Sequence, residues 1–405
     1  METLQPKLRF PMFEGDWERK SLRDITSLVT KGTTPKFFTE SGINFIKIEC
    51  LNGHNIDTSK CLFIDETTHN KELKRSILKE DDLLFAIAGA TIGKCTIVDK
   101  SILPANTNQA LSIIRLNNNE NKNYIFQILT SEAMKKYIID NISVGAQPNL
   151  NLEQINSFSF SYPTLHEQTR IANFLSSVDE KLNLLKEKKA LLEDYKKGIM
   201  QKIFNQELRF KDDNGQDFEE WEEILISELT NVIVGGTPST IKEEYWNGDI
   251  AWLSSGELNN GLVVKAKKYI TAIGLKNSSA KLLKPNTVLL AMTGATLGKI
   301  GFLTFESCGN QSIAGFEPNN KFVSKFFYYN LLFNKNLILS MAGGAAQQGI
   351  NKASIESLYF SFPNIKEQTI IANFLSSIDE KTELVATQIT DTQEYKKGLL
   401  QQMFI

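Results

Sequence analysis

Two stretches of this 405-residue sequence decide its organisation, because one nearly repeats the other. Residues 157–181 read SFSFSYPTLHEQTRIANFLSSVDEK, and residues 357–381 read SLYFSFPNIKEQTIIANFLSSIDEK. Positions 171–177 and 371–377 are identical. The repeat spacing of about 200 residues is far longer than the roughly 20–50 residues of solenoid repeats. The chain is therefore a tandem duplication of one domain-sized half.

Looser matches extend the repeat through the rest of each half. The matched pairs are Leu8-Arg9-Phe10 with Leu208-Arg209-Phe210, Trp17 with Trp221, Gly32-Thr33-Thr34-Pro35 with Gly236-Thr237-Pro238, FAIAGATIGK (85–94) with LAMTGATLGK (290–299), Asn108-Gln109 with Asn310-Gln311, Gln147 and Asn151 with Gln347 and Asn351, and Tyr195–Gly198 with Tyr395–Gly398. On this alignment the first glycine turn carries one extra threonine. The sequences between these anchors differ, so the halves are expected to share a scaffold but not a surface.

The first part of each half reads as mixed α and β structure. Apolar runs that end at turn residues predict short strands, as at Ile43–Ile48, Leu83–Ala88 and Val288–Met292. Helices are predicted from Tyr124 to Ile139 and from Lys325 to Ser340. The order of the strands does not follow from these patterns.

The second part of each half predicts one long helix. Apolar residues recur in alternating steps of mostly four and three, which is the heptad rhythm of a helix buried along one seam. The seam positions are Ile171, Leu175, Val178, Leu182, Leu185, Leu192, Ile199 and Ile203 in the first copy, and Ile371, Leu375, Ile378, Val385, Ile389, Leu399 and Met403 in the second. Pro163 and Pro363 stand just before the helices, where proline is tolerated.

Each long helix spans about 37 residues and therefore about 55 Å. A domain of about 160 residues has a radius of gyration near 15 Å, so the helix is longer than such a domain. Packing of the two helices against each other is favoured over the alternative, in which each is buried within its own globular half. Lys189, Lys196, Lys396, Thr382 and Thr392 interrupt the seams.

The sequence contains no duplicated catalytic constellation. The three histidines, His54, His69 and His166, all lie in the first half, so no repeated site can use histidine as a base or metal ligand. A phosphate-binding P-loop needs four residues between its glycines and a Ser or Thr after the lysine. Gly89 and Gly93 enclose three residues, and Cys95 follows Lys94. We expect a non-catalytic chain, with Asp179-Glu180-Lys181 on a solvated helix face.

The repeated polar positions are instead hydroxyls, amides and lysines near turns. Such groups bond base edges and phosphates, although each is also typical of a turn or cap. The Gly-Ala-Thr-x-Gly-Lys loops likewise have two interpretations, either a contact with a phosphate or a tight connection between strands. The candidate DNA-binding residues are Thr33, Thr34, Lys36, Lys47, Asn52, Thr91, Lys94, Asn108, Gln109, Gln147, Asn149, Thr237, Ser239, Ser254, Ser255, Asn259, Thr296, Lys299, Asn310, Gln311, Gln347 and Gln348.

These features together resemble the specificity subunit of bacterial type I restriction–modification enzymes. The resemblance covers essentially the whole chain and is carried most specifically by the Glu-Gln-x-x-Ile-Ala-x-Phe-Leu helix starts at Glu167 and Glu367. It implies an α/β (α+β) fold with target-recognition domains at 1–162 and 207–362. The long helices, within 163–206 and 363–405, would pack as an antiparallel coiled coil that spaces the two domains and docks partners.

The resemblance also implies a function and a set of partners. Each recognition domain would read one part of a bipartite, asymmetric site in double-stranded DNA. Two methyltransferase subunits and restriction subunits would join the chain, and they would hold S-adenosylmethionine, ATP and Mg²⁺, so that this chain binds no cofactor. A coiled-coil adaptor without DNA binding is the alternative, supported by the net charge of −2. Four cysteines without a CxxC pair, and the lack of a long apolar segment, predict a cytoplasmic protein that does not enter a membrane.

Overall fold

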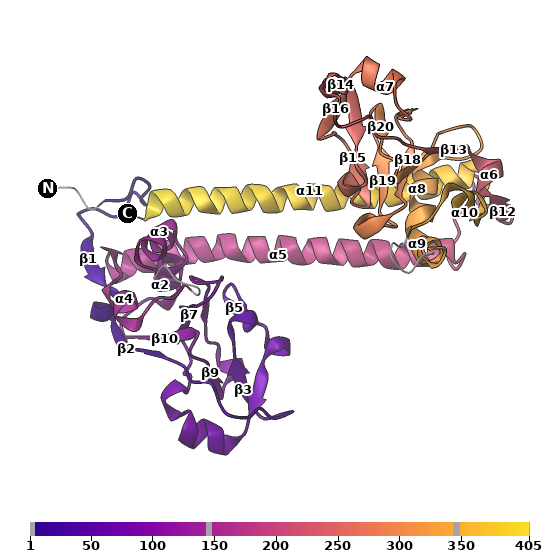
Figure 1. Cartoon of the computed structure of the whole chain (residues 1–405). Coiled ribbons are helices and arrows are strands. Elements are labelled where there is room, and N and C mark those ends of the chain that lie inside the picture. The colour runs from indigo at the N-terminus through magenta and orange to yellow at the C-terminus, as the bar shows by residue number, and fades with distance from the viewer. Residues whose placement is uncertain (1–4, 143–147, 343–348, 405) are drawn as a thin grey trace. The chain divides into compact units, whose positions relative to one another are not determined.

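The chain folds into two compact units in a computed structural model that describes residues 5–142, 148–342 and 349–404 (Figure 1). Unit 1 comprises residues 1–186 and 387–405, and unit 2 comprises residues 187–386. Each unit contains a stretch of both long helices. The division therefore differs from the four linear segments expected from the sequence, because the long helices α5 (Leu165–Phe204) and α11 (Ile365–Met403) each run through both units.

Unit 1 is built from three small sheets, one short hairpin and helices that cover one side. Its strands are β1 (Glu18–Ser21), β2 (Thr26–Lys31), β3 (Ile43–Ile46), β4 (Leu51–Asn52), β5 (Asn55–Ile56), β6 (Leu62–Ile64), β7 (Leu83–Ala86), β8 (Cys95–Ile97), β9 (Ala105–Thr107), β10 (Leu111–Leu116) and β11 (Ser159–Tyr162). Its shorter helices are α1 (Leu22–Ile25), α2 (Lys122–Leu129), α3 (Glu132–Asn141) and α4 (Leu152–Ser157). The sheet orders are β2-β10-β7-β8, β6-β3-β9, β1-β11 and β4-β5.

Unit 2 repeats this plan with a larger central sheet. Its strands are β12 (Glu222–Leu225), β13 (Val232–Val234), β14 (Trp246–Leu253), β15 (Gly261–Val263), β16 (Lys268–Ile270), β17 (Leu282–Leu283), β18 (Val288–Ala291), β19 (Ile300–Leu303), β20 (Ser307–Gly309), β21 (Ile313–Phe316) and β22 (Tyr359–Phe362). Its shorter helices are α6 (Ile226–Leu229), α7 (Ala272–Lys276), α8 (Ser324–Phe333), α9 (Lys335–Ser340) and α10 (Lys352–Glu356). The sheet orders are β13-β21-β18-β19-β15, β16-β14-β20-β17 and β12-β22.

The central strand of each unit is apolar at every position because both of its faces are buried. In β7, Leu83 and Phe85 enter the core beneath the helices, whereas Leu84 and Ala86 enter a second core against the small sheet. In β18, Val288 and Leu290 face the helical core, and Leu289 and Ala291 face the other. The alternation follows from the two-residue period of a strand.

Each shorter helix predicted as one segment is two helices. Between α2 and α3 the chain turns at Ser131, whose side chain accepts a hydrogen bond from the backbone N–H of Met134 and so begins a new helix. Between α8 and α9 the turn falls at Asn334, whose amide donates to the carbonyl and side-chain oxygens of Asn330. The predicted strands are each present and end one or two residues earlier than expected, at Ile46, Ala86 and Ala291.

The long helices α5 (Leu165–Phe204) and α11 (Ile365–Met403) pack against each other within each unit. In unit 1, Ile171 and Leu175 near the start of α5 share a core with Leu399 and Met403 near the end of α11. In unit 2, Ile203 near the end of α5 shares a core with residues at the start of α11. The start of one helix thus meets the end of the other, which confirms the predicted antiparallel coiled coil. The described seam residues, from Ile171 to Met403, are buried or half-buried.

A buried ion pair joins the beginning of each half to the start of its long helix. Arg9 binds Glu167 through Nε–Oε1 at 2.7 Å and Nη2–Oε2 at 2.8 Å. Arg209 binds Glu367 with the same two-pronged geometry, at 3.3 and 2.9 Å. The two carboxylates are 2% and 0% exposed. Two parallel charge-assisted hydrogen bonds fix both distance and orientation, so this pair anchors each globular region to its helix.

Candidate nucleic-acid interface

A glycine turn in each half brings the predicted Thr and Gln residues together. A Cβ on Gly32 would lie 2.0 Å from the Thr107 carbonyl oxygen, and one on Gly235 would lie 2.1 Å from the Gly309 carbonyl oxygen. Gly32 and Gly235 are therefore structurally equivalent, and Thr33 corresponds to Gly236. The expected extra threonine is wrong, because the first turn differs from the second by a substitution and not by an insertion.

The same turn places a hydroxyl beside an amide in both halves. Thr34 Oγ1 donates to Gln109 Oε1, and Thr237 Oγ1 donates to Gln311 Oε1. With its oxygen held in this way, each amide still presents its two N–H donors. Both glutamines are exposed. These two Thr–Gln pairs are candidates for contacts with base edges or phosphates.

In unit 2 a row of hydroxyls connects three loops. Thr293 Oγ1 donates to Ser312 Oγ at 2.7 Å, and Thr296 Oγ1 donates to Ser255 Oγ at 3.0 Å. Because Ser312 follows Gln311, the row continues from the Thr–Gln pair described above. The predicted residues Ser255 and Thr296 are thereby brought together.

The two Gly-Ala-Thr-x-Gly-Lys loops are tight strand connections. Gly89 and Gly93 have φ of 82° and 93°, and Gly294 and Gly298 have φ of 69° and 76°, which favours glycine. The backbone N–H of Gly93 donates to the Ala86 carbonyl, and that of Gly298 donates to the Ala291 carbonyl. Lys94 is exposed and Lys299 half-buried, so each loop ends in a lysine that reaches solvent.

Several candidates use their polar atoms within the fold. Asn108 Oδ1 accepts from the Ala110 N–H, and Asn310 Oδ1 accepts from the Ser312 N–H. Ser254 Oγ donates to Glu257, which caps the short 3₁₀ helix Ser255–Glu257. The Lys47 ammonium lies 3.8 Å from Glu49. The turn-and-cap interpretation therefore applies to Asn108, Asn310 and Ser254.

The other described candidates are surface residues. Lys36, Asn52, Asn149, Ser239 and Asn259 are exposed, and Thr33 and Thr91 are half-buried. Thr33 Oγ1 accepts from Arg75, which sequence reasoning had not singled out. Gln147, Gln347 and Gln348 lie outside the described residues.

A cross-helix ion pair in each unit was missed by sequence reasoning. Lys396 Nζ on α11 donates to Asp179 Oδ1 on α5 at 2.6 Å, and in unit 2 Lys196 on α5 pairs with Asp379 on α11. The expected solvated face for Asp179 is wrong, because its side chain is only 14% exposed. The signal was present in the lysines that interrupt the seam.

Asp179 has two further partners in unit 1. Gln127 Nε2 donates to Asp179 Oδ2 at 2.8 Å, and His54 Nε2 lies 3.1 Å from the same oxygen. The His54 ring also packs against Phe126 at an interplanar angle of 33°, with centroids 3.8 Å apart. Burial disfavours the charged form of Asp179, but the hydrogen bonds of His54 and Lys396 outweigh it and lower the pKa of Asp179 to about 2. Asp379 is held instead by the Tyr329 hydroxyl at 2.7 Å.

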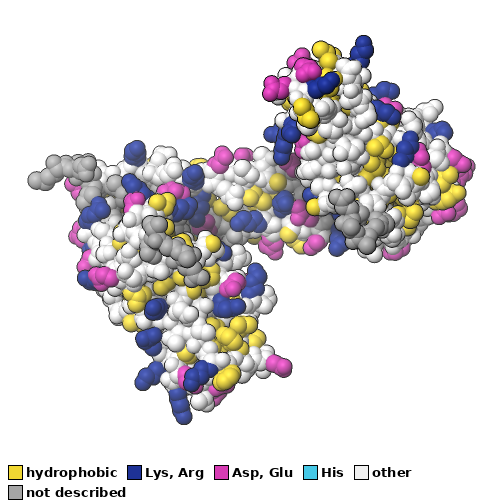
Figure 2. Space-filling model, viewed as in Figure 1, with side chains coloured by type: hydrophobic (Ala, Val, Ile, Leu, Met, Phe, Trp, Pro, Cys, Tyr) yellow, Lys and Arg dark blue, Asp and Glu magenta, His cyan; other side chains and the backbone are white. Residues whose placement is uncertain are grey.

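Other features limit what the site can be. In the described part of the chain, no three His, Cys, Asp or Glu side chains gather as metal ligands. None of the helices that the structure describes combines the length and apolarity needed to cross a membrane. On the face drawn in Figure 2, basic and acidic side chains are interspersed.

Known proteins resemble this chain in both sequence and fold. The family model described as "Type I restriction modification DNA specificity domain" matches residues 14–194 and again residues 218–392. The chain is 25% identical to the putative type I restriction enzyme MjaX specificity subunit of Methanocaldococcus jannaschii, over 95% of this chain and 92% of the relative.

Two solved structures share the fold at low identity. The type I restriction–modification S subunit from M. genitalium gives a TM-score of 0.62 at 16% identity, over 99% of both chains. A structure described as underlying complex assembly and conformational transition of the type I R–M system gives 0.61 at 14% identity, over 95% of this chain and 96% of that one.

Proposed function

Because the chain belongs to the family of type I restriction–modification DNA specificity subunits, we propose that it selects the DNA sequence on which such an enzyme acts. The observation that carries this proposal is that one specificity domain occurs twice, on equal scaffolds with unequal loops. Lys47 and Ile48 of the first half correspond to Ser254 and Ser255 of the second. Two recognition domains with different loops would recognise a bipartite, asymmetric site in double-stranded DNA.

Exposed amides and hydroxyls suit the recognition of bases. Asn and Gln bond adenine in two places, and Ser and Thr bond base edges or phosphates. Gln109 and Gln311 present such amides at equivalent positions of the two halves. Since the net charge is −2, partner subunits would supply many of the contacts to the DNA backbone.

The catalytic steps would belong to those partners. Two methyltransferase subunits would dock on this chain and transfer a methyl group from S-adenosylmethionine to adenine. Restriction subunits would add the ATP- and Mg²⁺-dependent reactions. In this arrangement the specificity chain contributes the choice of sequence, and no step of the chemistry passes through its residues.

A segment exchange tests the division of the site. Residues 232–350 are replaced by the corresponding segment of a divergent relative, which leaves the β12–β22 pair and the Arg209–Glu367 pair intact. Sequencing of methylated adenines in cells that contain the complex should show one changed half-site. The matched exchange of residues 28–150 should change only the other. Changes in both half-sites from one exchange, or methylation independent of this chain, would contradict the proposal.

A second test concerns the long helices, which we propose set the distance between the half-sites. Insertion near Lys202 would disturb the unit 2 core, where Ile203 is fully buried. Seven residues are therefore inserted in both helices, after Lys186 and after Ala386, to keep the seams in phase. Seven residues of helix add about 10 Å, or about three base pairs at 3.4 Å each. An active complex with an unchanged spacer would show that another element sets the distance.

A further inference from the structure

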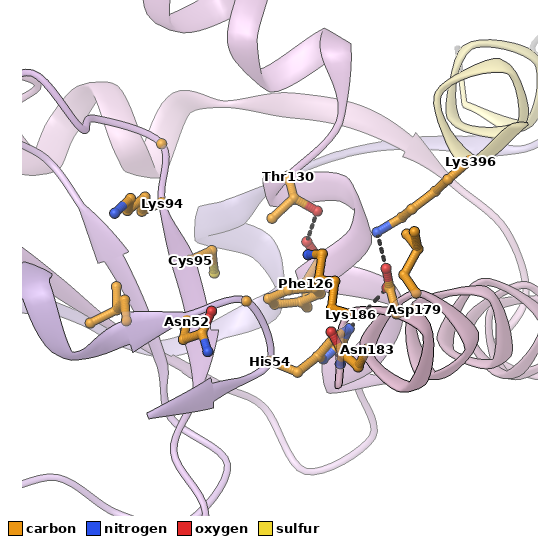
Figure 3. A pocket seen from close by; sticks show the side chains of 14 residues that line it. Asn52, His54, Lys94, Cys95, Phe126, Thr130, Asp179, Asn183, Lys186 and Lys396 are labelled. Atoms are coloured by element: carbon orange, nitrogen blue, oxygen red, sulfur yellow. Dashed lines mark hydrogen bonds and ion pairs between the residues drawn. The ribbon is translucent and has the colours of Figure 1, made fainter. Parts of the chain in front are cut away.

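Unit 1 contains a pocket of about 370 Å³ between its recognition loops and the two long helices (Figure 3). That volume lies at the lower end of the roughly 300–1,000 Å³ of small-molecule sites. Asn52 and His54 line it from the β4–β5 hairpin, and Lys94 lines it from the glycine loop. Asn183 and Lys186 come from α5, and Lys396 comes from α11.

The pocket has an excess of positive charge. Its one lining carboxylate, Asp179, already accepts bonds from Lys396, Gln127 and His54. Among residues 5–142, 148–342 and 349–404, neither Lys94 nor Lys186 makes an ion pair. Two lysines without an ion-pair partner therefore line the pocket from different elements, together with Asn52 and Asn183.

The equivalent place in unit 2 differs from this pocket at several of its positions. The repeat runs without a gap from Lys47–His54 to Ser254–Gly261, so Gly261 replaces His54. On the long helix Glu383 replaces Asn183, and Ala386 replaces Lys186. The Tyr328 hydroxyl, at the position of Phe126, bonds the Asn260 carbonyl at 2.7 Å. At these two helix positions the second half has an acid and no cation, but it keeps Lys299 at the position of Lys94 and places Lys325 beside the Tyr328 ring.

We propose that the unit 1 pocket binds a phosphate group. Lysine is a point-charge partner for phosphate, and Asn52 and Asn183 offer N–H donors to its remaining oxygens. The phosphate comes either from the DNA backbone, in which case the inference rests on the proposed function, or from a free phosphate ion. Because Asn183 and Lys186 are replaced by Glu383 and Ala386 in the second half, phosphate binding by this pocket would make the two halves unequal in a second respect besides the sequence they read.

The test titrates the full chain with inorganic phosphate against chloride at equal ionic strength and pH, following heat release and the unfolding temperature. Phosphate should bind saturably and raise the unfolding temperature. Lys186→Ala should weaken phosphate binding about tenfold, and Asn183→Glu with Lys186→Ala should abolish it. Lys181→Ala removes the same charge from an exposed position of α5 outside the pocket, and should leave binding unchanged.

A parallel titration with a short duplex identifies the source of the phosphate. If it is the DNA backbone, Lys186→Ala should lower the slope of log binding constant against log salt by about one, and inorganic phosphate should compete with the duplex. If it is a free ion, the slope stays the same while phosphate binding is lost. The proposal would be overturned if phosphate does not bind saturably and Lys186→Ala leaves the salt dependence of duplex binding unchanged. It would also be overturned if Lys181→Ala weakens phosphate binding as much as Lys186→Ala does. A chain that binds no duplex but binds phosphate would contradict the proposed DNA function alone.

Discussion

The two halves of the chain share the buried ion pairs that stabilise their scaffolds and differ in their exposed loop residues. Arg9–Glu167 and Arg209–Glu367 anchor each globular region to its long helix in the same geometry. Asp179 and Asp379 each bind a lysine from the opposite helix. A buried charge is tolerated only with its partner, so such pairs are hard to change one residue at a time. Exposed loop residues carry no such constraint.

The two halves also differ at one helix cap, where different side chains accept the hydrogen bond of the equivalent backbone N–H. Glu257 Oε1 accepts bonds from the Ser254 backbone N–H and hydroxyl and so caps a short helix. At the equivalent place the Cys50 sulfur accepts from the Lys47 N–H at 3.3 Å. The neighbouring Cys61 side chain lowers the pKa of Cys50. The cap is thus maintained while the side chain changes.

The largest effect should come from filling the close contact that both glycine turns share. Gly32→Ala and Gly235→Ala each place a Cβ about 2 Å from a backbone carbonyl oxygen, and we expect each to cost about 3 kcal/mol or more. Urea denaturation would measure it, with hydrogen exchange to locate the unit affected. As a control, Gly198→Ala has free space on α5 and should stabilise by up to about 1 kcal/mol. A small cost at either turn would break the equivalence of Gly32 and Gly235.

Removal of the buried carboxylate should be nearly as costly and similar in the two halves. Glu167→Ala and Glu367→Ala each leave a guanidinium without its partner, for an expected loss of about 3 kcal/mol. Glu180→Ala on the exposed face of α5 serves as the control and should change stability by less than about 0.5 kcal/mol. Unequal losses in urea denaturation would mean that the two anchors are not interchangeable parts of one scaffold.

Asp179→Asn should destabilise the chain by about 2 kcal/mol at pH 7. Its pKa of about 2 lies below the usual 3.8, so the ionised form stabilises the fold above about pH 4. That contribution is lost as the pH falls from about 4 towards 2, and the difference between wild type and variant should shrink over the same range. The comparison is made by urea denaturation at several pH values. Asp194→Asn, at an exposed position of α5, should show no such pH dependence.

The smallest effect should come from making the first half resemble the second at His54. His54→Ala removes the contact with Asp179 and the ring contact with Phe126, together about 1 kcal/mol. Amide hydrogens of Leu51–Ile56 should exchange about fivefold faster, which hydrogen exchange with mass spectrometry would measure. Residues 258–263 of the other half provide the internal control. Equal acceleration there would show a global change in stability.

Local patterns in the sequence by themselves determine much of this architecture. The duplication is visible in the seven identical positions 171–177 and 371–377, and the long helices are visible in their heptad seams. Both signals can be read directly from the sequence. The long helices are recognisable because the packing of a helix depends on the spacing of its apolar residues along the chain. The Thr–Gln candidates could also be identified from the sequence, since Thr34 and Gln109 recur at Thr237 and Gln311.

Contacts between distant residues were decided only by the tertiary structure. His54 and Asp179 are 125 residues apart, and Lys396 and Asp179 are 217 apart. Nothing in the spacing of a lysine within a helical seam says which carboxylate it will meet. The same holds for the order of the strands, for the correct alignment of Gly32 with Gly235, and for the unit 1 pocket. These features depend on how separate elements pack in three dimensions, whereas the repeat and the helices depend on periodicity within one segment of sequence.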